Sequence, residues 1–158
     1  RGGSLEYEEQ MQKYVEITRS GAVEVTIEAA ETHSQELEIQ RSMCNIIWFL
    51  TRQSDNIKTV ARLGAVVAVL KAMDKFYDDT DLQKAGCSAI KNLAFHTPNK
   101  TIIGENSGAR ILMRTMTSHK HDADIQTLAC AAIINVCAFS HENQAVFVKQ
   151  GAIDRIVE

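Results

Sequence analysis

The stretch DLQKAGCSAIKNLAFHTPNK, from Asp81 to Lys100, decides the fold because its pattern occurs three times in the chain. It stands 43 residues earlier as EIQRSMCNIIWFLTRQSDNIK (Glu38 to Lys58) and 43 residues later as DIQTLACAAIINVCAFSHENQ (Asp124 to Gln144). Three residue types keep one phase in all copies: Gln40, Gln83 and Gln126, Cys44, Cys87 and Cys130, and Ile47, Ile90 and Ile133. A repeat of this length with helical patterning indicates stacked helices, an all-α fold of the α-solenoid type.

A second marker, the dipeptide Gly-Ala, recurs with spacings of 43, 44 and 43 at Gly21, Gly64, Gly108 and Gly151. In each unit we expect a short first helix that ends near this glycine, where a small residue permits a sharp turn. A second, apolar helix follows. We then expect loops of different length, HSQE at His33, DKFYDDT at Asp74 and TSHKHDAD at Thr117.

The third helix of each unit is predicted to begin after a capping side chain, with Ser34, Thr80 and Asp122 as the candidates. Its apolar residues recur at intervals of four, four and three, which predicts a buried stripe. The stripes are Ile39, Met43, Ile47 and Leu50, then Leu82, Gly86, Ile90 and Leu93, then Ile125, Ala129, Ile133 and Val136. Gly86 lowers helix propensity, so we expect it to let a neighbouring helix approach closely.

The repeats divide residues 5–158 into one domain with units at about 12–53, 54–96 and 97–140 and a partial unit at 141–158. Residues 1–4, RGGS, resemble a cloning remnant, and Leu5 to Ile17 is predicted to form the opening helix. The last unit lacks a third helix, so we expect a segment of a longer array. Its apolar end, at Ile153, Ile156 and Val157, predicts end-to-end association.

Bulk composition narrows the class of partner. A net charge of −3 and a pI near 6.0 disfavour nucleic acid, whose binders usually carry a basic face. No apolar run is long enough to span a membrane, and no signal-peptide layout is present, which indicates an intracellular protein, cytoplasmic or nuclear. Three of the four cysteines share one position in an apolar helical pattern, so we interpret them as buried reduced thiols.

The arrangement of three helices per unit, with a third helix of the form Q-x-x-A-x-x-x-I-x-N-L-A, resembles the armadillo repeat from about Gln12 to Glu158. This resemblance implies a right-handed superhelix of about three and a half units. It also implies a concave groove that is lined by the third helices and holds an extended peptide. In the family an Asn near the end of each third helix hydrogen-bonds the peptide backbone, and Asn92 and Asn135 match that residue, whereas Phe49 replaces it in the first unit.

The predicted groove residues lie opposite the buried stripe at intervals of four: Arg41, Asn45 and Phe49, Lys84, Ser88 and Asn92, and Thr127, Ala131 and Asn135. His96 follows one turn after Asn92. Importin-α-like receptors place a Trp four residues before the Asn, where this chain has Asn45, Ser88 and Ala131, so binding of nuclear signals is not expected. Trp48 is interpreted as a packing residue. Arg41 and Lys84, with Arg52 and Lys91, predict that the groove favours acidic side chains in a ligand.

No sequence pattern predicts catalysis or a cofactor. The loop His119-Lys120-His121-Asp122 lacks a scaffold for three convergent metal ligands, and no nucleophile elbow, phosphate loop or paired-acid motif is present. We therefore expect a non-catalytic module that binds a protein or peptide. The competing hypothesis is a structural spacer or self-assembling segment of a larger cytoskeletal or signalling protein.

Overall fold

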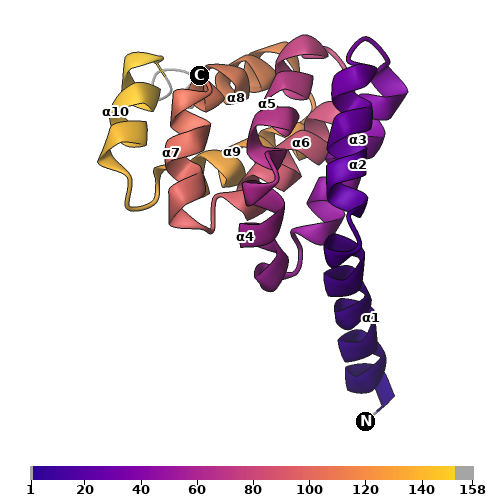
Figure 1. Cartoon of the computed structure of the whole chain (residues 1–158). Coiled ribbons are helices and arrows are strands. Elements are labelled where there is room, and N and C mark those ends of the chain that lie inside the picture. The colour runs from indigo at the N-terminus through magenta and orange to yellow at the C-terminus, as the bar shows by residue number, and fades with distance from the viewer. Residues whose placement is uncertain (1, 152–158) are drawn as a thin grey trace.

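The computed structural model describes residues 2–151, with the side chains of 9, 10 and 12–151 (Figure 1). The described residues form helices and contain no strand, as the sequence predicts. The helices are α1 (Gly2–Arg19), α2 (Ala22–Thr32), α3 (Leu37–Leu50), α4 (Ser54–Arg62), α5 (Ala65–Lys75), α6 (Thr80–Leu93), α7 (Thr97–Glu105), α8 (Gly108–Ser118), α9 (Ala123–Cys137) and α10 (His141–Lys149).

The helices follow one another in groups of three. First helices α4, α7 and α10 begin at Ser54, Thr97 and His141, the residues at which the sequence divides into units. The third helices α3, α6 and α9 pack side by side in chain order, and each packs on the second helix of its own unit. Helix α1 begins at Gly2, earlier than predicted, and its N-terminal part projects away from the body of the molecule (Figure 1).

In each of the three complete units the turn between the first and second helices uses one left-handed residue: Gly21 (φ 86°), Gly64 (φ 93°) and Ser107 (φ 62°). Gly151, at the equivalent position after α10, is also left-handed (φ 73°). Gly108 was expected to mark this turn, and the structure corrects that expectation, because Gly108 is the first residue of α8. A Cβ at Gly108 would lie 2.7 Å from the carbonyl oxygen of Ile103, so close packing explains this glycine.

The loops between second and third helices have the same length in all three units, which corrects the predicted variation. They comprise residues 33–36, 76–79 and 119–122, because the helices on either side are longer than expected. The caps differ too. Asp122 accepts a hydrogen bond from the Ile125 amide as predicted, but Asp79 rather than Thr80 caps α6, and α3 follows Glu36 without a side-chain cap.

The recurring glutamines close the C-terminal ends of the second helices. The side-chain amide of Gln83 donates to the carbonyl oxygens of Met73 (2.9 Å) and Phe76 (3.1 Å). Gln40 and Gln126 make the same pair of bonds one unit away on either side. Because the last carbonyls of a helix lack partners within it, this marker is explained by capping.

A second polar marker closes the third helices. Asn56, Asn99 and Asn143 lie in the first helices and donate to the carbonyl oxygens of Leu50, Leu93 and Val136. The spacing of these asparagines is 43 and then 44 residues, and α9 is one residue longer than α3 and α6. The additional residue of the third unit therefore lies near the end of α9.

The core runs between the third and second helices, and most of the predicted stripe is buried in it. Gly86 has the role that the sequence predicts. A Cβ there would lie 2.5 Å from Cγ and 2.7 Å from Sδ of Met73, which fills the space from α5. Cys44 and Cys87 are buried, whereas Cys130 is only half-buried, which corrects its assignment to the core.

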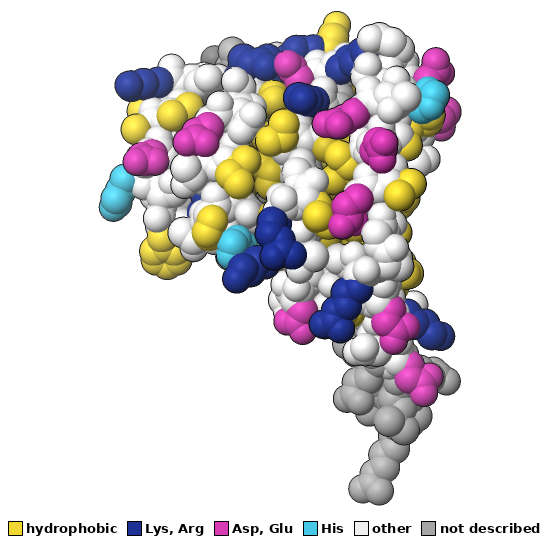
Figure 2. Space-filling model, viewed as in Figure 1, with side chains coloured by type: hydrophobic (Ala, Val, Ile, Leu, Met, Phe, Trp, Pro, Cys, Tyr) yellow, Lys and Arg dark blue, Asp and Glu magenta, His cyan; other side chains and the backbone are white. Residues whose placement is uncertain are grey.

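Charged side chains of both signs are intermixed over the face of the molecule on which α2, α4, α5 and α7 lie in front (Figure 2). Within the described residues, no helix combines the length and apolar character that a membrane span needs. The predicted apolar end at Ile153, Ile156 and Val157 lies outside the described residues.

Candidate functional site

A groove of about 780 Å³ crosses the three third helices. Five of the ten predicted groove residues line it: Arg41, Asn45, Lys84, Ser88 and Thr127. They come from α3, α6 and α9, so the groove is a surface of the whole stack and not of one unit. It is an open channel shared by neighbouring helices, which is the kind of site that a segment of chain can enter.

The other five predicted residues are not part of the groove lining. Phe49 is exposed beside α1, where its ring packs edge-on against Tyr14 at 4.8 Å between centroids. Ala131 is half-buried. The imidazole of His96 lies 3.4 Å from the amide oxygen of Asn99 at the start of α7.

The two predicted ladder asparagines lie at the contacts between units. Asn92 is 9% exposed, and its amide nitrogen lies 3.4 Å from the hydroxyl of Thr51 in the preceding unit. Asn135 donates to the carbonyl oxygen of Lys91 at 2.9 Å. In the free domain both side chains thus join neighbouring third helices, and their contact with a ligand stays a prediction.

Trp48 lines the groove and is 36% exposed, although we interpreted it as a packing residue. Helix geometry explains the error. Seven residues make nearly two full turns of an α-helix, whereas eight overshoot by about 80°. Trp48, seven residues after Arg41, therefore continues the groove face, and Phe49 turns away from it.

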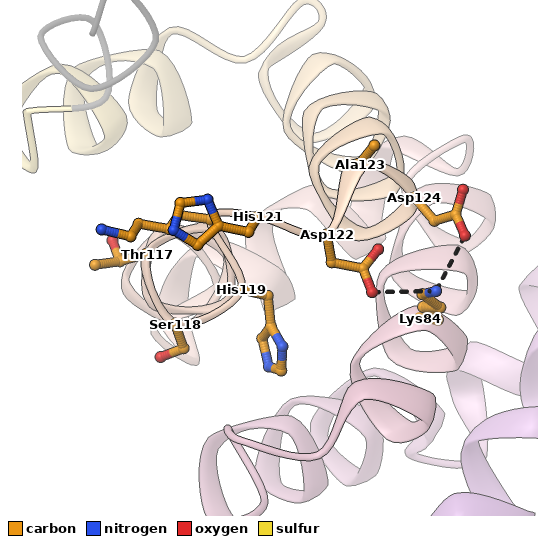
Figure 3. Close-up of a pocket in the computed structure, with 9 residues that line it drawn as sticks. Lys84, Thr117, Ser118, His119, His121, Asp122, Ala123 and Asp124 are labelled. Atoms are coloured by element: carbon orange, nitrogen blue, oxygen red, sulfur yellow. Dashed lines mark hydrogen bonds and ion pairs between the residues drawn. The ribbon is translucent and has the colours of Figure 1, made fainter.

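The basic groove residues are paired within the chain. The guanidinium of Arg41 donates from Nε to Asp79 at 2.8 Å and from Nη1 to Glu38 at 2.7 Å. Lys84 repeats the contact with the next cap one unit later, with Nζ 3.2 Å from Asp122, and its second partner is Asp124 of α9 at 3.0 Å (Figure 3). In both cases a basic side chain on a third helix contacts the residue that caps the third helix of the next unit.

These contacts shift the ionisation of both partners in the stabilising direction. The hydrogen bond from Arg41 lowers the pKa of Asp79, and the hydrogen bonds that Lys84 donates to Asp124 and Asp122 raise the pKa of Lys84. The Ile125 amide and then Lys84 lower the pKa of Asp122. The charges are therefore fixed at neutral pH.

Because Arg41 and Lys84 are paired with carboxylates of the chain, they no longer favour an acidic ligand. Along the N-terminal ends of α6 and α9 and the first turn of α3, five carboxylates accompany the two cations Arg41 and Lys84: Glu38, Asp79, Asp81, Asp122 and Asp124. We name this set the acidic rim. Its excess charge is negative, so this side of the groove favours basic groups in a ligand.

A smaller pocket lies against the loop 119–122, next to Lys84 (Figure 3). His119 points from this loop toward the loop 76–79, and its Nε2 lies 2.9 Å from the carbonyl oxygen of Tyr77. His121 is exposed on the loop. Among the described residues, no three His, Cys, Asp or Glu side chains lie close enough together to hold a metal ion.

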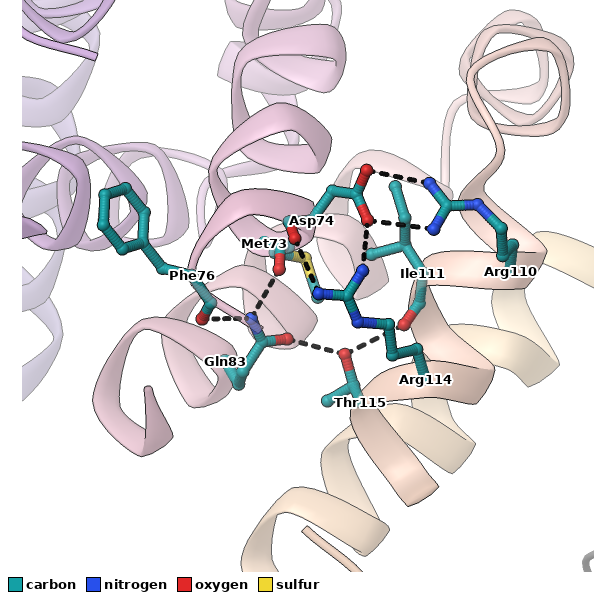
Figure 4. A network of polar contacts seen from close by, with 8 residues as sticks. All are labelled: Met73, Asp74, Phe76, Gln83, Arg110, Ile111, Arg114 and Thr115. Atoms are coloured by element: carbon teal, nitrogen blue, oxygen red, sulfur yellow. Dashed lines mark hydrogen bonds and ion pairs between the residues drawn. The ribbon is translucent and has the colours of Figure 1, made fainter. Parts of the chain in front are cut away.

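A polar network behind the groove joins the second and third units (Figure 4). Arg110 and Arg114 of α8 both reach Asp74 of α5, with Arg110 donating through both terminal nitrogens at 3.0 and 2.8 Å. The Arg114 guanidinium also stacks on Tyr77 at 3.7 Å from the ring centroid. Gln83 accepts a hydrogen bond from Thr115 at 2.6 Å. These bonds hold α8 of the third unit against α5, α6 and the loop 76–79 of the second unit.

Comparison with known proteins agrees with a helical repeat. The family model described as Protein zer-1 homolog-like, C-terminal domain, matches residues 28–158. No curated protein and no solved structure matches the chain.

Proposed function

Since the chain belongs to the family of zer-1 homolog-like C-terminal domains, a helical repeat-type family, we propose that it is a non-catalytic protein-binding module of the armadillo type. Its groove along α3, α6 and α9 holds an extended segment of a partner protein. The observation that carries this proposal is the continuous groove, to which each of the three complete units contributes a side chain that a ligand can reach.

The chemistry of the lining supports a peptide ligand. Asn45 and Thr127 offer neutral donors and acceptors that suit a peptide backbone without a requirement for one sequence. Trp48 adds an exposed aromatic face, a residue type that is enriched at protein interfaces. The ion pairs between units join the third helices that carry these groups before a ligand binds, which reduces the entropy cost of binding.

The test is selection of a displayed library of random twelve-residue peptides on the intact chain, followed by measurement of affinity for groove variants. Thr127→Trp and Asn45→Trp fill the groove from exposed positions and should weaken the selected peptides tenfold or more, an estimate of about 1.4 kcal/mol. Thr101→Trp, at an exposed threonine of α7 outside the groove, is the matched control. Failure to select peptides, or equal binding by Thr127→Trp, would refute the proposal.

A second candidate function, self-association, is favoured by an apolar pocket at the α1 end of the stack. Ile17, Ile46, Trp48, Phe49 and Leu50 border about 410 Å³ there. Ile46 occupies the repeat position of Ala89 and Ala132, which are fully buried, whereas Ile46 is 37% exposed. Sedimentation equilibrium should then show association that Ile46→Glu abolishes, and a monomer at every concentration would exclude it.

The proposal includes an intracellular location, cytoplasmic or nuclear, which rests on the sequence alone. If the chain binds neither peptides nor copies of itself, the structural-spacer hypothesis replaces both candidate functions.

A further inference from the structure

The C-terminal ends of the third helices carry exposed aromatic side chains. Trp48 lies two residues before the end of α3, and Phe95 and Phe139 lie two residues after the ends of α6 and α9. Their exposed fractions are 36%, 68% and 98%. We name these three residues the aromatic rim. The aromatic rim lies near the C-terminal ends of the third helices and the acidic rim near their N-terminal ends, so the two rims lie at opposite ends of these helices. Trp48 is the member of the aromatic rim that lines the groove.

Phe139 stands out by its backbone as well as its exposure. Its φ is 57°, in the left-handed region that phenylalanine rarely adopts. It belongs to the part of the third unit that has one additional residue, between Gln126 and Asn143. A strained, solvent-exposed aromatic side chain gains nothing from packing in the free domain, and such outliers are concentrated at functional sites.

From these two rims we propose the class of segment that the groove binds: an extended peptide in which basic and apolar side chains alternate. This inference rests on the proposed function. Successive side chains of an extended chain point to opposite sides. A segment that crosses the third helices thus turns every second side chain toward the acidic rim and the others toward the aromatic rim.

The dimensions fit this arrangement. Ten residues of α3 separate Glu38 from Trp48, a rise of about 15 Å. Twelve residues of α6 separate Asp81 from Leu93, two positions before Phe95, a rise of about 18 Å. A backbone with a long side chain on each flank can span such separations. Neighbouring helices lie about 8–10 Å apart, whereas every second residue of an extended chain advances about 6.8 Å. Long, flexible lysine or arginine side chains can absorb that mismatch, so the segment should be six to eight residues long, roughly three helix spacings.

The acidic rim determines the orientation of the segment and the aromatic rim supplies the contact area. Carboxylates near helix N-termini also stabilise the helices themselves, so their presence alone does not identify a ligand. Asp81 lines the groove and forms no ion pair within the described part of the chain, in contrast to Glu38 and Asp124. It is the carboxylate best placed to receive a cation.

Three capped eight-residue peptides with a fluorophore test the inference by anisotropy. The first is Lys-Val-Lys-Phe-Lys-Val-Lys-Phe, the second has the same residues with the four lysines first, and the third has glutamate in place of lysine. The alternating peptide should bind at least about fivefold more tightly than the block peptide, and the glutamate peptide more weakly than both. Equal binding of the alternating and block peptides overturns the inference.

Variants of the intact chain separate the two rims. Phe139→Gly and Phe95→Ser should each weaken the alternating peptide about three- to tenfold without a change in salt dependence. Asp81→Asn should weaken it and also reduce its salt dependence. Val25→Ser is the matched control, since Val25 is 65% exposed on α2 outside the groove. If the double variant Phe139→Gly, Phe95→Ser binds the alternating peptide as tightly as the parent, the inference is overturned.

The library selection distinguishes this inference from the proposed function. If the selected peptides no longer bind Thr127→Trp but do not alternate basic and apolar residues, the groove is still the binding site and only the alternating ligand is refuted. Peptides that bind Thr127→Trp unchanged would refute both.

Discussion

Arg41 of the first unit binds Asp79, the residue that caps the third helix of the second unit. The Asp79 carboxylate accepts from Arg41 and also from the backbone amide of Leu82 at 2.9 Å. The equivalent residues Lys84 and Asp122 stand 43 positions later and repeat the contact. One carboxylate therefore both begins a helix and fixes it to its neighbour.

This double role predicts a graded response at Asp79. Asp79→Ala removes the cap and the ion pair, and loss of the cap alone should lower the free energy of unfolding by about 1 kcal/mol. Asp79→Asn keeps an oxygen that can cap, so it should cost less. Urea unfolding of the two variants checks the order, and an equal loss in both would show that the cap contributes nothing.

The same carboxylate predicts a dependence on pH. Arg41 holds the pKa of folded Asp79 below its ordinary value, so its contribution is present above the unfolded pKa near 4 and is lost as pH falls through the folded pKa. The free energy of unfolding should decline from about pH 4 downward more steeply in the parent than in Asp79→Asn. Parallel curves for the two proteins would contradict the assignment.

The recurring glutamines should differ in cost according to their burial. Gln83 is fully buried, donates to two carbonyl oxygens at the end of α5 and accepts a hydrogen bond from Thr115. Gln83→Ala should therefore lower the free energy of unfolding by about 2–4 kcal/mol. Gln126 makes the same two backbone bonds but is half-buried, and Gln126→Ala should cost less. Urea unfolding of both measures this, and a larger loss at Gln126 would contradict the capping explanation.

The helical units could be predicted from the sequence because their signals are local. The phase of Gln40, Gln83 and Gln126 and the apolar stripe both follow from helix geometry and from the need to cap helix ends. The left-handed turn was assigned one residue too late in the third unit. Gly108 is required there by packing against Ile103, and the turn itself uses Ser107.

The groove was only half predictable, because its composition depends on contacts between units. Whether Asn92 and Asn135 face a ligand depends on Thr51 and on the Lys91 carbonyl, which lie 41 and 44 residues away in sequence. The pairing of Arg41 with Asp79 is equally remote, and it neutralises a positive charge on which the expected preference for an acidic ligand was based. Trp48 could have been found by counting seven residues instead of eight.

Gly86 and Met73 provide a test of packing between α5 and α6. Gly86→Ala should gain helix propensity but crowd buried Met73, with a net loss of about 1–2 kcal/mol. Met73→Ala creates the space, so the double variant should be more stable than the sum of the single changes predicts, by about 1 kcal/mol or more. A double-mutant cycle by urea unfolding measures the coupling, and additivity would show that the two side chains do not compete for one space.

The four cysteines should separate into two classes. Burial raises the pKa of the Cys44 and Cys87 thiols to about 12, and only the thiolate reacts with a disulfide reagent. Cys130 and Cys137 are half-buried, so at pH 8 they should be labelled in the folded protein, Cys137 more slowly because burial also raises its pKa. Mass spectrometry of the labelled chain identifies the sites, and labelling of Cys44 before denaturation would contradict the packing described.

The two left-handed residues that are not glycine predict stabilising substitutions. A non-glycine residue in this conformation costs about 1–2 kcal/mol, and glycine in its place loses part of the gain to chain entropy. Ser107→Gly and Phe139→Gly should therefore each raise the free energy of unfolding by about 0.5–1 kcal/mol, because neither exposed side chain contributes much packing. Gly64→Ala, at the equivalent turn, should lower it by about 1 kcal/mol and serves as the control. Thermal unfolding measures all three. A gain at Phe139 that is accompanied by loss of the alternating peptide would show that the third unit keeps strain for the sake of binding, whereas a loss of stability would show that the Phe139 side chain packs within the domain.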